Sequence, residues 1–164
     1  AMRPVCTAAV ADGQIYVLGD DRSLPLGSGS RERVDPHTRT WDTMPAMPSR
    51  RTCCSMAAVN GKLVVVGGLA GVFQKSTEIY DPTTNAFSLG PEMAMPRYVP
   101  TAVKIDDRRI LVIGGYNGAG YLRSTEVLDI ESMTFSAGPT MGTRRSGATA
   151  VKLADEGRVV VIGG

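Results

Sequence analysis

Short apolar stretches separated by turn residues recur along the whole chain. The most strongly apolar of them are continuous aliphatic runs that end in glycine, at 15–20, 63–68, 110–115 and 159–164. The first glycines of these runs lie 48, 47 and 49 residues apart, at Gly19, Gly67, Gly114 and Gly163. Recurrence at a fixed period of this length is typical of a structure built from repeated supersecondary units.

Each period contains four stretches of strand length. Small residues form the first stretch, the aliphatic run is the second, a segment that closes on an aspartate is the third, and the fourth begins near an aromatic residue. Asp12-Gly13 and Asn60-Gly61 separate the first two stretches, and both dipeptides favour tight hairpin turns. The pattern predicts a four-stranded antiparallel sheet in each period. We expect the small first strand to lie innermost, near a common axis, and the aliphatic second strand to be buried on both faces.

The turn between the third and fourth stretches also repeats. The third stretch ends at Asp35, Asp81 or Asp129, and an aromatic residue stands six positions later, at Trp41, Phe87 or Phe135. An aspartate at such a position can accept hydrogen bonds from the amides of the following turn.

These anchors together resemble the kelch repeat, in which an apolar run closed by two glycines is followed by a Tyr-Asp pair and an aromatic residue. The chain departs from the pattern at Gly19-Asp20, which lacks the second glycine, and at Val34 and Leu128, which replace the tyrosine. The resemblance implies an all-β fold, a kelch-type β-propeller of four-stranded antiparallel blades. It places the blades at about 3–49, 50–96 and 97–143, with a half blade at 144–164.

Three and a half blades form an incomplete ring, because propellers have about four to eight blades. We expect the chain of residues 1–164 to be a partial kelch propeller, part of a longer one. An open arc exposes unpaired strand edges, so self-association through these edges is a second expectation.

Composition and charge narrow the class of partner. The chain has 164 residues, of which 43% are hydrophobic and 21% are charged, and its 18 basic and 16 acidic residues leave a formal charge of +2. This balance does not favour binding to nucleic acid or to an anionic membrane. No apolar run reaches membrane-spanning length and none resembles a signal peptide, so we expect a cytoplasmic protein.

Residues with catalytic or metal-binding chemistry are sparse. The single histidine, His37, falls in a predicted turn, and no nucleophile elbow, phosphate loop or triad pattern occurs. We therefore expect no catalytic residues, no metal and no cofactor. Cys6, Cys53 and Cys54 fit buried thiols in a reducing compartment, with a close pair between Cys6 and Cys53 or Cys54 as the alternative.

Charged residues that recur in every period are expected to be architectural. Glu32, Glu78 and Glu126 repeat, as do Arg51, Arg97 and Arg145, and we expect Arg3 to be the equivalent of these arginines. We expect ion pairs between neighbouring blades from these two sets. The alternative is a ring of arginines that receives an acidic ligand, because arginines at this point contact acidic peptides in some kelch adaptors.

The loops after each glycine pair differ between periods, and so do the links from one blade to the next. They carry aromatic and basic residues of the kind that dominate protein interfaces. The alternative is an ordinary polar loop with an aromatic residue packed back onto it. The candidate partner-binding residues are Arg22, Arg50, Phe73, Lys75, Arg97, Tyr98, Tyr116, Asn117, Tyr121, Arg123 and Arg144.

The resemblance implies a protein-interaction scaffold that presents variable loops on a rigid propeller. It suggests a substrate adaptor of a ubiquitin ligase or a cytoskeleton-binding module, with a protein or peptide ligand that has an acidic surface. The alternative is a fragment of a kelch-type enzyme or of a carbohydrate-active propeller whose catalytic residues lie in other blades.

Overall fold

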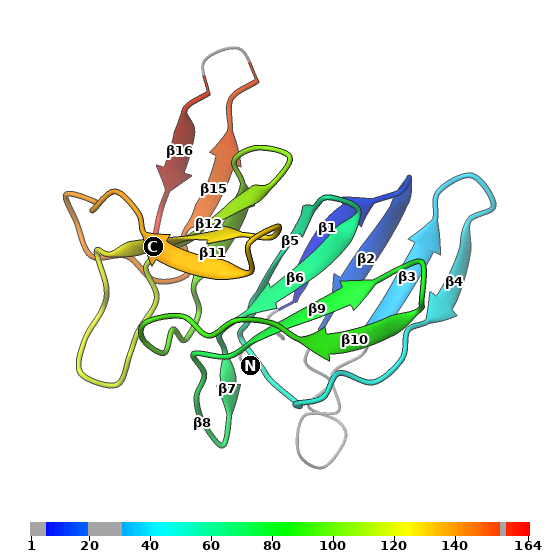
Figure 1. The fold of residues 1–164 in the computed structure, drawn as a ribbon, viewed down its shortest axis with the longest axis horizontal. Helices are drawn as coiled ribbons and strands as arrows, with labels where there is room; N and C mark the ends of the chain where they lie inside the picture. The colour runs from blue at the N-terminus through cyan, green and yellow to red at the C-terminus, as the bar shows by residue number, and fades with distance from the viewer. Residues whose placement is uncertain (1–5, 20–30, 155–156) are drawn as a thin grey trace.

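The computed structural model describes residues 6–19, 31–154 and 157–164, and these residues form β-strands joined by turns and loops (Figure 1). Sheet I consists of β1 (Thr7–Ala11), β2 (Gln14–Leu18), β3 (Arg31–Asp35) and β4 (Thr40–Thr43). Sheet II consists of β5 (Ser55–Val59), β6 (Lys62–Val66), β9 (Thr77–Asp81) and β10 (Ala86–Leu89). Sheet III consists of β11 (Thr101–Lys104), β12 (Arg109–Ile113), β13 (Thr125–Asp129) and β14 (Thr134–Ala137).

Two smaller pairings complete the described structure. Sheet IV contains β15 (Thr149–Lys152) and β16 (Val159–Ile162), and a short hairpin contains β7 (Leu69–Ala70) and β8 (Val72–Phe73). The four sheets follow one another as an open arc, with sheets I and IV at its two ends (Figure 1). The expected all-β architecture of four-stranded antiparallel sheets in an incomplete ring is therefore confirmed.

Neighbouring strands pair antiparallel in every four-stranded sheet, as the hydrophobic pattern predicts. The two predicted hairpin turns have positive φ at both central residues, 50° and 74° at Asp12-Gly13 and 49° and 68° at Asn60-Gly61. Positive φ at both positions is the geometry of the type I′ turn, whose twist matches that of the flanking strands.

The predicted aspartate turns are also present at the far end of the third strands. The Oδ1 atom of Asp81 accepts a hydrogen bond from the Thr83 amide at 2.9 Å, and Asp129 Oδ1 accepts one from the Glu131 amide at the same distance. Asp35 Oδ1 accepts a bond of 2.8 Å from the amide of His37. His37 is thus an exposed turn residue.

The hydrophobic core lies between consecutive sheets. One cluster joins sheets I and II and includes Tyr16, Leu63 and Val65, while the other joins sheets II and III. Val64 points into that second cluster, so β6 is buried on both faces, as its continuous aliphatic run predicts. The sheets are therefore held face to face by apolar side chains.

The first strands of consecutive sheets lie next to one another and are joined by short polar side chains. Thr7 Oγ1 accepts a hydrogen bond from the Met56 amide at 3.1 Å, and Ser55 Oγ accepts one from the Ala102 amide at 2.9 Å. Small residues allow this close approach, which confirms that the first strand of each sheet is innermost.

No helix in the described part of the chain is long and apolar enough to cross a membrane.

Candidate functional site

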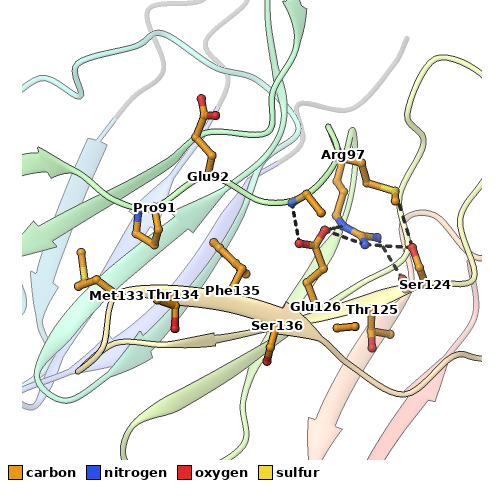
Figure 2. Close-up of a pocket in the computed structure, with 13 residues that line it drawn as sticks. Pro91, Glu92, Arg97, Ser124, Thr125, Glu126, Met133, Thr134, Phe135 and Ser136 are labelled. Atoms are coloured by element: carbon orange, nitrogen blue, oxygen red, sulfur yellow. Dashed lines mark hydrogen bonds and ion pairs between the residues drawn. The ribbon is translucent and has the colours of Figure 1, made fainter.

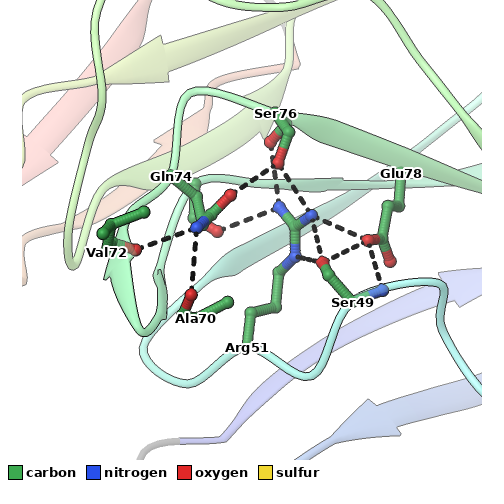
Figure 3. Close-up of polar contacts among 8 residues, drawn as sticks. Ser49, Arg51, Ala70, Val72, Gln74, Ser76 and Glu78 are labelled. Carbon is green, nitrogen blue, oxygen red and sulfur yellow. Dashed lines mark hydrogen bonds and ion pairs between the residues drawn. The ribbon is translucent and has the colours of Figure 1, made fainter.

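The buried residue Arg51 lies in the link between β4 and β5, through which the chain enters sheet II. The Arg51 guanidinium donates hydrogen bonds to the carbonyl oxygens of Gly67 at 3.1 Å and Ser76 at 2.9 Å (Figure 3). Its Nη2 atom lies 2.8 Å from Glu78 Oε1, and neither side chain is exposed to solvent. The same carboxylate oxygen accepts bonds from the amide and the hydroxyl group of Ser49. The link that enters sheet II is therefore bound to the third strand of that sheet.

Sheet III repeats this arrangement with Arg97. Its guanidinium donates to the carbonyl oxygens of Gly114 at 2.7 Å and Ser124 at 3.0 Å. Figure 2 shows the Arg97 side chain beside Glu126, where its Nη2 atom lies 3.0 Å from Glu126 Oε1. The other Glu126 oxygen accepts a bond of 2.8 Å from the Ala94 amide. Burial lowers the pKa of Arg97, and the adjacent Glu126 carboxylate opposes that shift.

These contacts correct the expected direction of the ion pairs. Arg51 precedes the first strand of sheet II, and its partner Glu78 lies in the third strand of the same sheet. Arg97 and Glu126 have the same positions in sheet III. Each salt bridge therefore lies within one repeat rather than between two. Hydrogen bonds also connect successive repeats, since the Glu126 carboxylate accepts one from the Ala94 amide and the Arg97 carbonyl accepts one of 2.8 Å from the Gly68 amide of sheet II.

The structure also corrects the place of Arg97 among the candidate partner-binding residues. The residue has no solvent-exposed surface, and its donors are directed at Glu126, Ser124 and Gly114. The Arg97 guanidinium is therefore not presented to a partner in this structure. Arg3 and Arg22 lie outside the described residues.

Four other candidates come together in one cluster, which we call the aromatic patch: Phe73, Tyr98, Tyr116 and Tyr121. The Phe73 ring lies 5.5 Å from the ring of Tyr98 and 5.5 Å from that of Tyr116. The Tyr116 and Tyr121 rings are 5.4 Å apart. These separations are typical of attractive aromatic pairs. The patch thus joins the β7–β8 hairpin, the link into sheet III and the loop after β12.

Backbone and side-chain hydrogen bonds hold the aromatic patch in place. Tyr98 and Tyr116 exchange two backbone bonds of 2.8 Å each, and the Tyr116 hydroxyl donates to the Gly118 carbonyl at 2.8 Å. The Cys53 thiol donates to the Tyr98 hydroxyl oxygen at 3.4 Å. The rings are therefore positioned by the fold before any partner is present.

Part of the aromatic patch and its surroundings is exposed. Tyr121 is 59% exposed, and Val72, in the hairpin that carries Phe73, is 69% exposed. Val72 was not among the predicted residues, because a single aliphatic residue in a variable loop has no sequence signal of its own.

One basic residue, Arg144, contacts the aromatic patch, and the other basic candidates differ in their pairing. Arg144 donates a hydrogen bond of 2.9 Å to the carbonyl oxygen of Tyr121, and its side chain is exposed. Arg123 and Arg50 are also exposed, and no acidic residue in the described chain forms an ion pair with either of them. Lys75 differs from them, because it lies 2.6 Å from Glu92. The Asn117 side chain accepts bonds from the amides of Ala119 and Gly120, which assigns it to shaping the loop.

The strand directions separate this surface from the aspartate turns. Third strands run from the glycine end of the sheet to their aspartate, so the aromatic patch and the Asp35, Asp81 and Asp129 turns lie at opposite ends of the sheets. We call the end that carries the aromatic patch the loop face.

All three cysteines are free thiols. Cys6 is exposed, Cys53 is buried and Cys54 is half-buried, where burial raises its pKa to about 11. A thiol with such a pKa is almost fully protonated at neutral pH and is a poor nucleophile. Within the part of the chain that the structure describes, no group of three or more His, Cys, Asp or Glu residues is placed to hold a metal ion.

Comparison with known proteins gives one family and several relatives. The kelch motif matches residues 50–94 and 97–142, which together make up more than half of the chain. The chain is 27% identical over 119 residues to the spermatocyte protein spe-26 of Caenorhabditis elegans. The aligned region covers 69% of this chain and 21% of that protein. It is 31% identical over 116 residues to Kelch-like protein 33 of Homo sapiens, covering 69% of this chain and 22% of the relative.

A plant relative has similar coverage. An F-box/kelch-repeat protein of Arabidopsis thaliana is 32% identical over 123 residues, which is 69% of this chain and 26% of that protein. The chain thus spans about a quarter or less of the length of these relatives.

Proposed function

Since this chain belongs to the kelch-repeat family, we propose that it is a protein-interaction scaffold that binds a protein or peptide through its loop face. The blades of this scaffold are proposed at about 3–49, 50–96 and 97–143, with a half blade at 144–164. The single observation that carries the proposal is the aromatic patch, in which two successive repeats contribute Phe73, Tyr98, Tyr116 and Tyr121 to one preformed surface.

A preformed aromatic surface suits protein binding for a physical reason. Tyrosine and phenylalanine contribute large contact areas and lose little conformational entropy when they are already packed. The patch combines packed rings with the 59% exposed Tyr121, so a partner can bury apolar surface there without reorganising the loops.

The charges around the patch favour an acidic partner. Arg50, Arg123 and Arg144 are exposed on the loop face, whereas the acidic residue Glu92 is paired with Lys75. Carboxylates of a partner would therefore meet unpaired guanidinium groups, which accelerate association and form strong charge-assisted hydrogen bonds.

At the level of the cell, we propose a cytoplasmic substrate adaptor or cytoskeleton-binding module. The F-box and Kelch-like names of the relatives support the adaptor role. Because the chain covers only a small share of those relatives, this assignment concerns the propeller part of such a protein. Self-association through open sheet edges is proposed as a second mode of contact.

The test is binding of the 164-residue chain to an array of peptides graded in net charge, followed by affinity measurement on the best ligand. We expect the acidic peptides to bind, and Tyr121→Ala to reduce affinity about tenfold or more, as is typical of an interface hot spot. Arg144→Ala should weaken binding and reduce its dependence on salt concentration.

Matched controls are available away from the loop face. Trp41 is another exposed aromatic residue, at 57%, and Arg39 is another exposed arginine. Trp41→Ala and Arg39→Ala should leave the affinity unchanged. Equal binding of basic and acidic peptides would overturn the acidic preference, and an affinity that is insensitive to Tyr121→Ala and Arg144→Ala would overturn the proposed surface.

A further inference from the structure

Three equivalent backbone positions, each two residues before the first strand of its sheet, have a positive φ in sheets II, III and IV. The values are 54° at Cys53, 50° at Val99 and 69° at Gly147. The Val99 amide donates a hydrogen bond of 3.0 Å to the Cys53 carbonyl, and the Gly147 amide donates one of 3.0 Å to the Val99 carbonyl. These bonds connect successive repeats, so the architecture itself requires the left-handed conformation at this position.

Valine is an unfavourable residue for this conformation. Glycine adopts it without a steric penalty, and sheet IV has a glycine there, Gly147. A β-branched residue at positive φ is a strained outlier, because its Cβ atom and its two methyl groups crowd the backbone. The Val99 side chain therefore destabilises the conformation that the fold imposes on it.

Packing within the fold does not account for the valine. Its counterpart Cys53 is buried, and the Cys53 thiol donates to the Tyr98 hydroxyl oxygen at 3.4 Å, so that side chain holds a ring of the aromatic patch. Val99 is only half-buried, and neither of the two apolar clusters in the described part of the chain includes it. What the Val99 side chain supplies is therefore a partly exposed apolar surface.

This apolar surface lies directly beside the aromatic patch. Val99 follows Tyr98 in the chain, and the Tyr98 ring lies 5.5 Å from that of Phe73. Two backbone hydrogen bonds of 2.8 Å between Tyr98 and Tyr116 hold this segment in place. Val99 and Pro100 also line the inner surface of the first strands. Val99 thus adds an aliphatic contact between the aromatic patch and the innermost strands.

From this strained position beside the aromatic patch we propose that Val99 is a specificity-determining residue of the loop face. It selects, among acidic peptides, those with an aliphatic side chain between their carboxylates. This inference rests on the proposed function and adds the class of ligand to it. The carboxylates meet the exposed Arg50 and Arg144, and the aliphatic side chain packs against Val99 and Pro100. Strained backbone conformations cluster at ligand-binding sites, where the surrounding structure holds them in place.

The probes are two fluorescent peptides of equal charge, Glu-Asp-Glu-Leu-Glu-Asp-Glu and the same sequence with alanine in place of leucine. Each is titrated into the 164-residue chain and followed by anisotropy. We expect the leucine peptide to bind about tenfold more tightly, because it buries more apolar surface. Val99→Gly should abolish this preference and leave the affinity for the alanine peptide unchanged. The same substitution should raise the melting temperature, because it relieves the strained backbone.

Two further variants separate the contact from the strain. Val99→Ala keeps the Cβ atom and removes the two methyl groups, so it should lose the leucine preference without the rise in melting temperature. Met133→Gly is the matched control, because Met133 has a φ of 55° in the turn before β14, away from the loop face, and this variant should keep the preference. Equal affinity of the parent chain for both peptides would overturn this inference alone, as would a retained preference or a lower melting temperature in Val99→Gly. Absence of binding by both peptides would overturn the proposed function as well.

Discussion

At the scale of single residues, burial decides the role of the repeated charges. Arg97 and Arg144 are both arginines in a link or loop at the same end of the sheets, yet one is fully buried beside Glu126 and the other is exposed beside Tyr121. A buried charge must be paired, because the loss of hydration is otherwise uncompensated. Arg97 therefore depends on Glu126 to remain buried, whereas Arg144 keeps an exposed guanidinium group.

This difference predicts a large effect of Glu126→Gln on stability. The substitution leaves the Arg97 guanidinium buried without a counter-charge, and we expect the free energy of unfolding to fall by about 3–5 kcal/mol. The measurement is urea denaturation of the variant and the parent chain.

The exposed pair between Lys75 and Glu92 provides the control. Its side chains are more than half exposed, so Glu92→Gln should change the free energy of unfolding by less than about 1 kcal/mol. Similar losses for Glu92→Gln and Glu126→Gln would contradict the assigned role of burial.

At the scale of the elements, the glycine that ends the aliphatic run is required by a contact between repeats. Gly114 has a φ of 59°, and a Cβ atom at this position would overlap the carbonyl oxygen of Arg145. The second strand of one sheet and the link into the next approach each other too closely for any side chain. Glycine is thus required here for space as well as for backbone conformation.

Gly114→Ala should therefore destabilise the chain much more than Gly71→Ala. Gly71 also has a positive φ, of 76°, but a Cβ atom there would meet open space. We expect Gly71→Ala to cost about 1 kcal/mol, the penalty of the left-handed conformation, and Gly114→Ala to cost about 3 kcal/mol or more. Thermal unfolding of both variants measures the difference, and equal melting temperatures would show that the close contact does not matter.

At the scale of the whole molecule, stability is expected to decrease from the middle of the arc to its ends. Sheet II packs against neighbours on both faces, whereas sheet I leaves Trp41 57% exposed and sheet IV leaves Ile162 62% exposed. Local opening is easiest where few apolar contacts must be broken.

Hydrogen exchange should report this gradient directly. The amides of β6 pair on both sides of the strand and lie between two apolar clusters, so we expect them to exchange at least about a hundredfold more slowly than those of β16. Mass spectrometry of peptic fragments compares the two strands within one sample. Equal protection of β6 and β16 would indicate a single cooperative unit instead.

Much of the fold could be predicted because its determinants are local and repeated. Aliphatic runs closed by glycine, the Asp12-Gly13 and Asn60-Gly61 turns, and the aspartate turns each depend on a few adjacent residues, so their sequence pattern determines their conformation. Repetition at a common period then determined that the sheets are equivalent and that the chain forms an arc of them.

The candidate site could be predicted only as a set of residue types. The sequence indicated which loops vary and that they carry aromatic and basic residues, but the separation of Phe73 from Tyr116 along the chain says nothing about a ring contact of 5.5 Å. Likewise, the recurrence of arginine and glutamate indicated a pair, while the tertiary structure decided that the pair lies within a repeat and that Arg97 is inaccessible. The reason is that local backbone preferences act between neighbours in sequence, whereas burial and side-chain pairing depend on how successive sheets pack face to face.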